Sequence, residues 1–243
     1  MTTKGVERSN VGDNIAAPNA AWSFGADVAE SFVDHVRRSV PFYDAGHQLI
    51  CEVSDFFVKD DSICYEIGVS TGELLGKLAR HNAGKRARWC GLDVEETMIA
   101  RAKKNLTGLG NVELHVGDAT TWEFEKTDLV VSYYCVQFIP PKLRQTVIDT
   151  IYERLNWGGA LLLFEKVRAY DARFQDVMTA LYQEFKLRQE FSPSEIVAKA
   201  RSLKGVLEPF STQGNVDMLK RAGFVDVMSI MKYVCFEGFL AVK

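Results

Sequence analysis

The spacing of hydrophobic positions changes several times along the chain. From about residue 61 onward, short and nearly continuous apolar runs alternate with segments whose apolar residues recur every three or four positions. Runs of the first kind are typical of buried strands, and the second spacing is typical of amphipathic helices. The expected strands are 63–67, 87–92, 112–116, 128–133, 160–164, 225–233 and 236–242, and the expected helices are 73–81, 95–106, 142–155 and 214–221. Residues 156–159 are expected to form a turn.

This alternation indicates the fold class. Apolar strands that alternate with helices favour a parallel sheet covered by helices on both faces. The last two strands are expected to pair as an antiparallel hairpin at the sheet edge. The sequence therefore predicts an α/β chain with a Rossmann-like class I methyltransferase fold. Its sheet would have seven mostly parallel strands and a C-terminal antiparallel hairpin.

Two further helical regions, 22–60 and 171–209, lie outside this alternation of strands and helices. Val28, Phe32 and Val36 recur every four positions and predict a helix over 25–40 that stops near Pro41, and a second helix is expected over 45–57. We interpret residues 22–60 as an N-terminal helical lid on a domain spanning 61–243. Residues 171–209 are also helical in pattern, and we expect them to form an insert over the carboxyl edge of the sheet. Residues 1–21 are polar and are expected to be a flexible N-terminus.

Composition narrows the choice of partners. The 243 residues carry a net charge of −3, so no basic face is implied and direct nucleic-acid binding is not expected. No apolar run approaches the ~18 residues of a membrane span, and the first ten residues lack the apolar core of a secretory signal. We expect a cytoplasmic protein without a membrane partner. The five cysteines and four histidines lack metal-ligand spacing, so no metal is predicted.

A glycine-containing segment follows the first predicted strand of the sheet. It reads Glu66-x-Gly68-x-Ser70-x-Gly72, and such small residues let the backbone pass close to a ligand. A carboxylate at the position of Glu66 can hold the ammonium group of an amino acid, directly or through water. Taken alone, the segment is also compatible with a simple tight turn.

Acidic residues follow the next two strands. Asp93 ends the second, where a carboxylate can accept hydrogen bonds from both ribose hydroxyls of an adenosine ligand. Gly117-Asp118-Ala119 follows the third, where Asp118 can read the adenine amino edge or cap a helix. Enzymes that use NAD also place an acid after the second strand, but their full G-x-G-x-x-G pattern is absent here. The three features together predict S-adenosylmethionine (SAM) as the cofactor.

The fourth strand ends in the segment 132–138, where the reactive sulfonium of SAM should point in such a fold. The aromatic faces of Tyr133 and Tyr134 can attract a sulfonium cation, or the two rings can simply belong to the core. Arg201, in the insert, is by itself most simply a solvated helix charge.

Several blocks of sequence outside these motifs carry a family resemblance. They are Ser23-Phe24, Arg38-Ser39-Val40-Pro41-x-Tyr43, Gln137-Phe138, Leu155-Asn156-x-Gly158-Gly159-Ala160-Leu161, Glu165-Lys166, Phe185-Lys186, Arg201-Ser202 and Ala222-Gly223-Phe224. From about Trp22 to its end, the chain resembles the carboxy-S-adenosylmethionine synthases, which supply the carboxymethyl donor for tRNA wobble-uridine modification.

The resemblance implies a reaction and a set of roles. SAM and prephenate would give carboxy-SAM and phenylpyruvate, and the protein would be a homodimer with its insert near the partner. Tyr43 would contact the cofactor from the lid. The remaining implied contacts are Gly68, Val69 and Ser70 to the methionine part, Asp93 and Val94 to the ribose, Asp118 and Ala119 to the adenine, and Arg201 to the added carboxylate.

The chain departs from the family near the reactive end of the ligand. It has Glu66 where the family has Asp, Val69 where the family has Cys, and Tyr133 where the family has Asn. These changes leave three hypotheses for a small, carboxylate-bearing substrate. They are carboxy transfer, methyl transfer or another SAM alkyl chemistry (including cyclisation that releases methylthioadenosine), and SAM binding without catalysis. The candidate catalytic residues are Arg201, Tyr133 and Tyr134.

Overall fold

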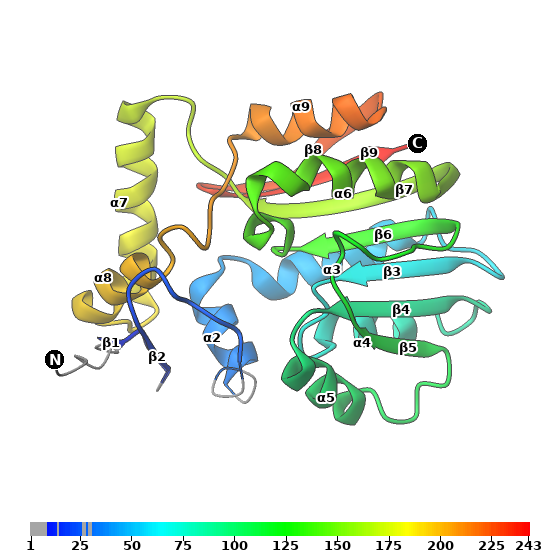
Figure 1. Cartoon of the computed structure of the whole chain (residues 1–243), viewed down its shortest axis with the longest axis horizontal. Coiled ribbons are helices and arrows are strands. Elements are labelled where there is room, and N and C mark those ends of the chain that lie inside the picture. The colour runs from blue at the N-terminus through cyan, green and yellow to red at the C-terminus, as the bar shows by residue number, and fades with distance from the viewer. Residues whose placement is uncertain (1–8, 14, 26–27, 29–30) are drawn as a thin grey trace, which may run out of the picture.

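A seven-stranded sheet runs through the centre of the molecule (Figure 1). The structure is a computed structural model that describes residues 9–13, 15–25, 28 and 31–243. The strand order is β5-β4-β3-β6-β7-β9-β8, parallel from β5 to β7, with β9 antiparallel to both of its neighbours. The strands are β3 (Ile63–Ile67), β4 (Arg88–Asp93), β5 (Val112–Val116), β6 (Thr127–Tyr133), β7 (Leu155–Lys166), β8 (Asp226–Tyr233) and β9 (Phe236–Val242). The predicted fold class is confirmed.

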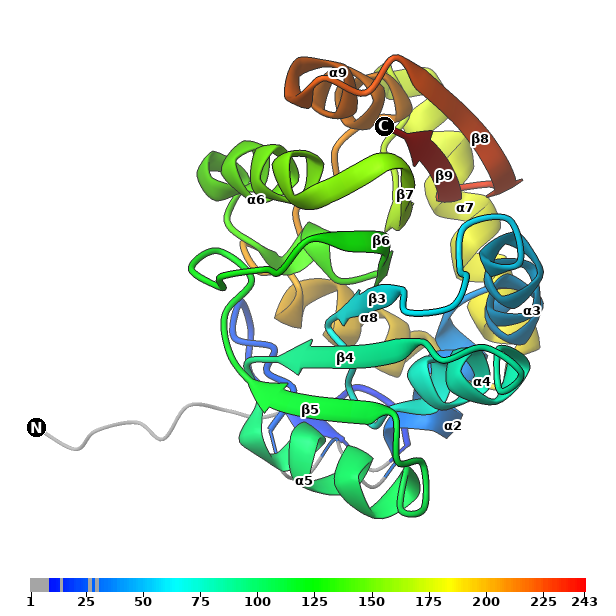
Figure 2. The same ribbon diagram turned by 90° about the vertical axis from the view of Figure 1, so that its right-hand side faces the viewer.

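Helices cover both faces of the sheet (Figure 2). They are α3 (Tyr43–Ser54), α4 (Glu73–His81) and α5 (Glu96–Asn105), then α6 (Pro141–Arg154) and α9 (Thr212–Ala222). Successive residues of a strand point to opposite faces, so Cys64 packs in the core under α3 and α4, whereas Tyr65 packs in the core under α6 and α9. Because both faces are buried, the strands read as continuous apolar runs rather than as alternating ones.

Most predicted boundaries from residue 61 onward agree with the structure to within two residues, whereas the helix predicted over 45–57 ends three residues earlier, at Ser54. Residues 156–159, predicted as a turn, belong to β7. The strand stays paired there because Gly158 donates to the carbonyl of Lys243 and Lys243 donates to the carbonyl of Gly159, at 2.8 and 3.0 Å. Gly158 has φ of +76°, a left-handed conformation that glycine adopts without strain.

Of the lid, α2 (Phe32–Ser39) lies beyond the carboxyl ends of the parallel strands, as does the insert (Figure 1), whereas α3 packs on one face of the sheet. The lid comprises α2 and α3, while the insert comprises α7 (Ala172–Arg188) and α8 (Pro193–Ser202). A short 3-10 turn, η1 (Val136–Phe138), connects the end of β6 to α6. Of the predicted helix over 25–40, residues 26–27 and 29–30 lie outside the described residues. No helix among the described residues is long and apolar enough to cross a membrane.

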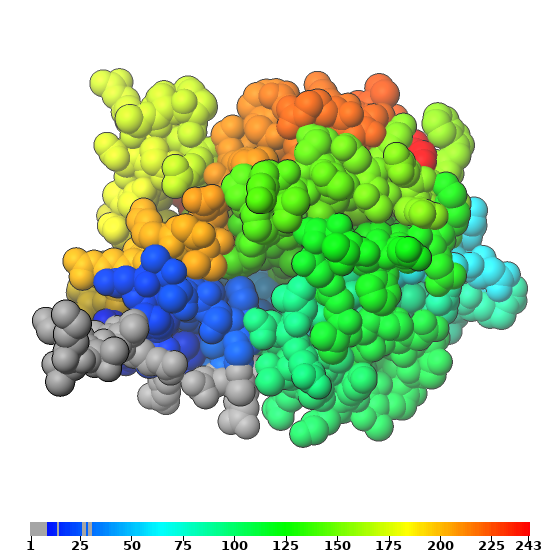
Figure 3. All heavy atoms as spheres, in the orientation of Figure 1, coloured from blue at the N-terminus to red at the C-terminus, as the bar shows by residue number. Residues whose placement is uncertain are grey.

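The N-terminal segment differs from the flexible tail expected for it. Ser9–Asn10 (β1) and Ala16–Ala17 (β2) pair as a small antiparallel sheet. Val11 and Ile15 are buried, because they share a core cluster with Trp22 and Met98. Trp22 also donates to the carbonyl of Ser202 at 3.1 Å, so this segment lies against α8 (Figure 3). Residues 1–8 and 14 of the predicted tail lie outside the described residues.

Candidate functional site

Two adjoining cavities lie at the carboxyl edge of the sheet. The smaller, about 320 Å³, lies against the ends of β3 to β6 and is called here the sheet-edge cavity. The larger, about 440 Å³, lies between the lid helices, the end of β6 and the insert, and is called the insert cavity. Both are lined by Phe24, Phe32, Gly68, Ser70, Tyr133, Tyr134 and Phe138. This shared wall allows one ligand to extend from one cavity into the other.

The segment from Glu66 to Gly72 contributes Gly68 and Ser70 to that wall. Gly68 and Gly72 have φ of +73° and +81°, and Ser70 also lies in the left-handed region at +50°. A Cβ on Gly68 would lie 2.5 Å from Sγ of Cys135, so only glycine fits there. Val69 is buried and lines the insert cavity. The glycines therefore let this loop turn tightly and pack against Cys135 and Leu106.

Glu66 is a buried carboxyl group without a charged partner. Its side chain lines the insert cavity, and Oε2 has no hydrogen-bond partner among the described residues. Burial, and secondarily the charge of Asp93, raises the pKa of Glu66 well above its usual value. A cation bound here would restore the charged form of the carboxylate, so the site suits an ammonium group.

Asp93 connects two strand ends. One of its carboxylate oxygens accepts a hydrogen bond from the amide of Ser70 at 2.8 Å, and the other from the amide of Glu95 at 3.0 Å. Each oxygen keeps a further lone pair with which it can accept a ligand hydroxyl. Burial raises the pKa of Asp93. Asp93 and the exposed Val94 both line the sheet-edge cavity.

The third predicted position lies at the far side of the same cavity. Asp118 is exposed, and its Oδ1 accepts a hydrogen bond from the amide of Thr120 at 2.8 Å. This bond stabilises a turn; no helix begins here, so the helix-cap alternative is wrong. Asp118 and the buried Ala119 nevertheless line the sheet-edge cavity, so the ligand role is compatible with it.

Tyr133 and Tyr134 lie at the junction of the two cavities. The Tyr133 hydroxyl donates to the carbonyl of Tyr43 at 2.7 Å, and the two tyrosine rings lie 4.6 Å apart between centroids. A Cβ on Gly46 would overlap the Tyr133 hydroxyl, so this glycine makes room for the ring. Burial raises the pKa values of Tyr133 and Tyr134, so both phenols are neutral near pH 7.

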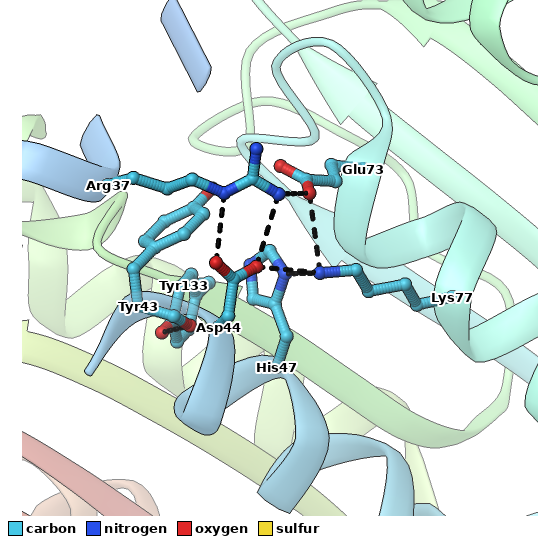
Figure 4. A network of polar contacts seen from close by, with 7 residues as sticks. All are labelled: Arg37, Tyr43, Asp44, His47, Glu73, Lys77 and Tyr133. Atoms are coloured by element: carbon cyan, nitrogen blue, oxygen red, sulfur yellow. Dashed lines mark hydrogen bonds and ion pairs between the residues drawn. The ribbon is translucent and has the colours of Figure 1, made fainter. Parts of the chain in front are cut away.

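A polar network connects the lid to α4 (Figure 4). Arg37 and Lys77 pair with the carboxylates of Asp44 and Glu73, and Lys77 also lies 3.0 Å from Nδ1 of His47. Asp44, His47 and Glu73 bring three potential metal-ligand atoms within 4.8 Å of one another. These carboxylates already neutralise two protein cations, and the absence of a metal stays a prediction.

Arg201 is not brought to either cavity within a single chain. The buried face of α8 consists of Ile196, Lys199 and Ser202, whereas Arg201 is exposed. Residues two positions apart on a helix point about 200° apart, so an inward Lys199 turns Arg201 outward. Gly72, also predicted as a cofactor contact, lines neither cavity, because it packs against Leu106 and Ala102. The other predicted site residues, from Tyr43 to Tyr134, line one or both cavities.

Sequence reasoning missed the cations that line the insert cavity: Lys166, Lys186, Lys199, Lys204 and Arg168. A spacing signal was available for one of them, since Met178, Tyr182 and Lys186 recur every four positions on α7 and all line the cavity. A lysine on such a face is ordinarily a boundary residue, so the spacing alone did not mark it as part of a site.

Comparison with known proteins places the chain in a family. A methyltransferase-domain family model matches residues 65–159, which include the glycine loop and the acidic strand ends. The O-methyltransferase family protein from Burkholderia thailandensis superposes with a TM-score of 0.63 and 19% identity, over 88% of this chain and 59% of that chain. Human N-acetylserotonin methyltransferase in complex with SAM superposes with a TM-score of 0.60 and 16% identity, over 88% of this chain and 55% of that chain. At such identities the likeness concerns the fold.

Relatives with higher identity share one name. The carboxy-S-adenosyl-L-methionine synthase of Campylobacter lari is 34% identical over 223 residues, which are 91% of this chain and 94% of that protein. The protein of the same name from Staphylococcus epidermidis is 33% identical over 91% of this chain and 97% of its own length. The chain therefore belongs to the carboxy-S-adenosyl-L-methionine synthase family.

Proposed function

We propose that this chain carboxylates SAM, with prephenate as the carboxyl donor and carboxy-SAM, phenylpyruvate and water as products. Family membership makes it a SAM-dependent transferase. The observation that carries the finer proposal is the junction of the two cavities at Gly68, Tyr133 and Tyr134. One cavity is suited to a nucleoside, and the other leaves room for a second small molecule beside its reactive end.

The residues fit SAM in a single orientation. The adenosine would lie in the sheet-edge cavity, with its ribose hydroxyls on Asp93 and its adenine beside Asp118 and Ala119. The unpartnered carboxyl of Glu66 would hold the ammonium group. The sulfonium would then lie by the rings of Tyr133 and Tyr134, whose faces attract a cation. Tyr43 would close this region from the lid.

Bound SAM would supply a methyl group that is acidified by the adjacent positive sulfur. Four side chains near the junction could act as a base: Tyr43, Tyr133, Tyr134 and Glu165. Burial raises the pKa of each of them. A neutral phenol or carboxyl group is a poor base near pH 7. This supports a reaction in which decarboxylating prephenate expels its ring hydroxide, which takes the methyl proton and leaves as water, while the carbanion left on the sulfonium captures the carbon dioxide.

The test is direct. Purified protein incubated with SAM and prephenate should form a product heavier than SAM by one carbon dioxide, as detected by mass spectrometry. Asp93→Ala serves as the inactive control. Calorimetric binding of SAM without formation of this product would exclude carboxy transfer.

Tyr133 favours a second candidate, methyl transfer to a small carboxylate-bearing acceptor or another SAM alkyl transfer. The family has Asn at this position, and the larger ring reshapes the space at the reactive end. Catalysis would then consist mainly of alignment in a dry site. Mass spectrometry separates these outcomes, because S-adenosylhomocysteine marks methyl transfer and methylthioadenosine marks cyclisation. Carboxy-SAM formation by Tyr133→Asn alone would indicate a diverged active site, and SAM binding without any product would favour a non-catalytic role.

A homodimer is proposed on the exposed face of α7. An apolar stripe at helical spacing runs along this face through Phe174, Val177 and Leu181, and Tyr170 precedes it. The four side chains are between 45% and 82% exposed. This helix forms one end of the molecule (Figure 3), and an exposed apolar stripe of this kind marks a protein interface. Arg201, on the neighbouring α8, is also exposed.

Light scattering after size exclusion tests the dimer. Leu181→Glu should shift the measured mass from that of a dimer to that of a monomer. Gln183→Glu, which introduces the same charge at an exposed polar position, is the control and should leave the dimer mass unchanged. A wild-type monomer at micromolar concentration would contradict the proposal.

A further inference from the structure

Three lysines enter the insert cavity from three different elements. Lys166 ends β7, Lys186 lies in the last turn of α7, and Lys199 lies on the inner face of α8. Lys186 and Lys199 are 6% and 7% exposed, and Lys166 is half-buried. Lysine is almost never this buried unless it is paired.

None of the three ammonium groups makes a hydrogen bond or ion pair with any residue that the structure describes. Their neighbours are aromatic rings. Nζ of Lys166 and Nζ of Lys186 lie 4.2 and 5.0 Å from the centroid of the same ring, Tyr182. Lys199 lies over the ring of Trp22. Ring faces attract cations but do not neutralise them.

The electrostatics agree with this geometry. Burial, and then the charge of Lys166, lowers the pKa of Lys186 to about 8. Burial, and then the charge of Lys186, lowers the pKa of Lys199 well below its usual value. Asp13 is the one described carboxylate whose charge raises the pKa of Lys199, and it is already paired with His35 and Arg38.

Glu66, Glu73 and Glu208 also line this cavity, but none of them pairs with the three lysines. Three converging cations without a paired acid are unfavourable unless something else neutralises them. An isolated buried ammonium group is costly, and like charges close together add to this cost. A purely structural role would be served better by apolar side chains of similar size. The arrangement therefore favours the binding of an anion that is not part of the chain.

We infer that Lys166, Lys186 and Lys199 form an anion subsite that holds the carboxylate groups of the second substrate. The inference rests on the proposed function. It assigns to these lysines a contact with a substrate carboxylate, which Arg201 does not make within one chain. Tyr182, Phe236 and Met178 line the same cavity, so the bound molecule should combine an apolar ring with two carboxylates. Its anionic end would face the insert, and its other end would face the junction at Tyr134.

Calorimetry with three unreactive probes tests the subsite. The protein is first saturated with S-adenosylhomocysteine and then titrated with phenylsuccinate, 3-phenylpropionate or 3-phenylpropanamide, which carry two, one and no carboxylates. Wild-type protein should bind them in that order of affinity. Lys186→Met and Lys199→Met should each weaken phenylsuccinate binding by about tenfold or more, because a charge-assisted contact is lost. Binding of S-adenosylhomocysteine should change by less than about twofold.

Arg188→Met is the matched control, since it removes one exposed cation two positions along the same helix and lines neither cavity. It should leave all three probe affinities unchanged. The Lys→Met variants should melt at or above the wild-type temperature without ligand, because an uncompensated buried charge is removed. If a variant does not fold, the melting temperature of wild-type protein is measured with phenylsuccinate and with 3-phenylpropanamide. A larger rise with phenylsuccinate supports the subsite, and equal rises contradict it.

Equal binding of the three probes by wild-type protein, or unchanged phenylsuccinate binding by both lysine variants, would overturn the subsite. The proposed reaction is judged separately. Carboxy-SAM formation with an unchanged KM for prephenate in the lysine variants would refute the subsite alone. Lysine-dependent phenylsuccinate binding without any carboxy-SAM would refute the reaction alone.

Discussion

The sheet-edge cavity takes its polar groups from the ends of neighbouring strands, whereas the insert cavity adds a group of buried or half-buried lysines from α7, α8 and the end of β7. The first has acidic side chains that already accept backbone hydrogen bonds, as Asp93 does from Ser70 and Glu95. The second has basic side chains, Lys166, Lys186 and Lys199, without partners among the described residues.

This difference indicates two kinds of ligand recognition. Acids held by backbone amides are rigid and suit a ligand with hydroxyl and ammonium donors. Uncompensated lysines have many rotamers and suit an anion that orders them when it binds. The shared wall at Gly68 and Tyr134 would place the two ligands in contact. Four predictions test this contrast, from the largest expected effect to the smallest.

Asp93→Ala should weaken SAM binding by roughly 100-fold, about 3 kcal/mol, because two backbone amides and the ribose hydroxyls lose their acceptor. Calorimetry with SAM measures the effect. Asp118→Ala, whose exposed carboxylate holds only the amide of Thr120 among the described residues, is the control and should change the affinity by less than about fivefold. Equal losses in the two variants would contradict the leading role of Asp93.

Gly46→Ala should lower the free energy of unfolding by about 1–3 kcal/mol, since its Cβ would overlap the Tyr133 hydroxyl at the junction. In a Tyr133→Asn background the overlap is absent, and alanine in the helix interior should stabilise by about 1 kcal/mol relative to glycine. Urea unfolding of the four proteins gives the coupling. Additive effects would mean that Tyr133 does not fill this space.

Lys186→Met should be more stable than wild type at pH 7 by about 1–3 kcal/mol, because burial lowers the pKa of Lys186 to about 8 from 10.5 in the unfolded chain. Between these values the folded protein binds fewer protons than the unfolded one, so wild-type stability rises with pH across this window. The gap between the two proteins should therefore close from pH 8 to 10.5 in urea titrations. Arg188→Met should show no such pH dependence, and a constant gap for Lys186→Met would show that this lysine is not desolvated.

Glu66→Gln should weaken SAM binding by about tenfold at neutral pH, because an amide cannot neutralise the ammonium group. Burial raises the pKa of Glu66, so binding must ionise this carboxyl and SAM affinity should increase as pH rises. The variant should lose that increase in a calorimetric pH series. Glu113→Gln, the same change on the exposed side of β5, should keep it.

The strands and helices followed from the sequence because their period is set by local geometry. Ile63–Ile67 and Glu73–His81 occur as predicted, since a buried strand and an amphipathic helix impose unmistakable spacings. Residues 156–159 were predicted wrongly. Their glycines resemble a turn, and only the pairing with the C-terminal strand keeps them in β7.

The sequence by itself determined the sheet, its order of elements and the acids at its strand ends, because each of these depends on neighbours along the chain. Only the tertiary structure decided which cations enter the site. The resemblance pointed to Arg201, yet the turn of α8 directs Lys199 inward and brings it together with Lys166 and Lys186. The packing of β7, α7 and α8 brings the three lysines together, and no periodicity in the sequence predicts this packing.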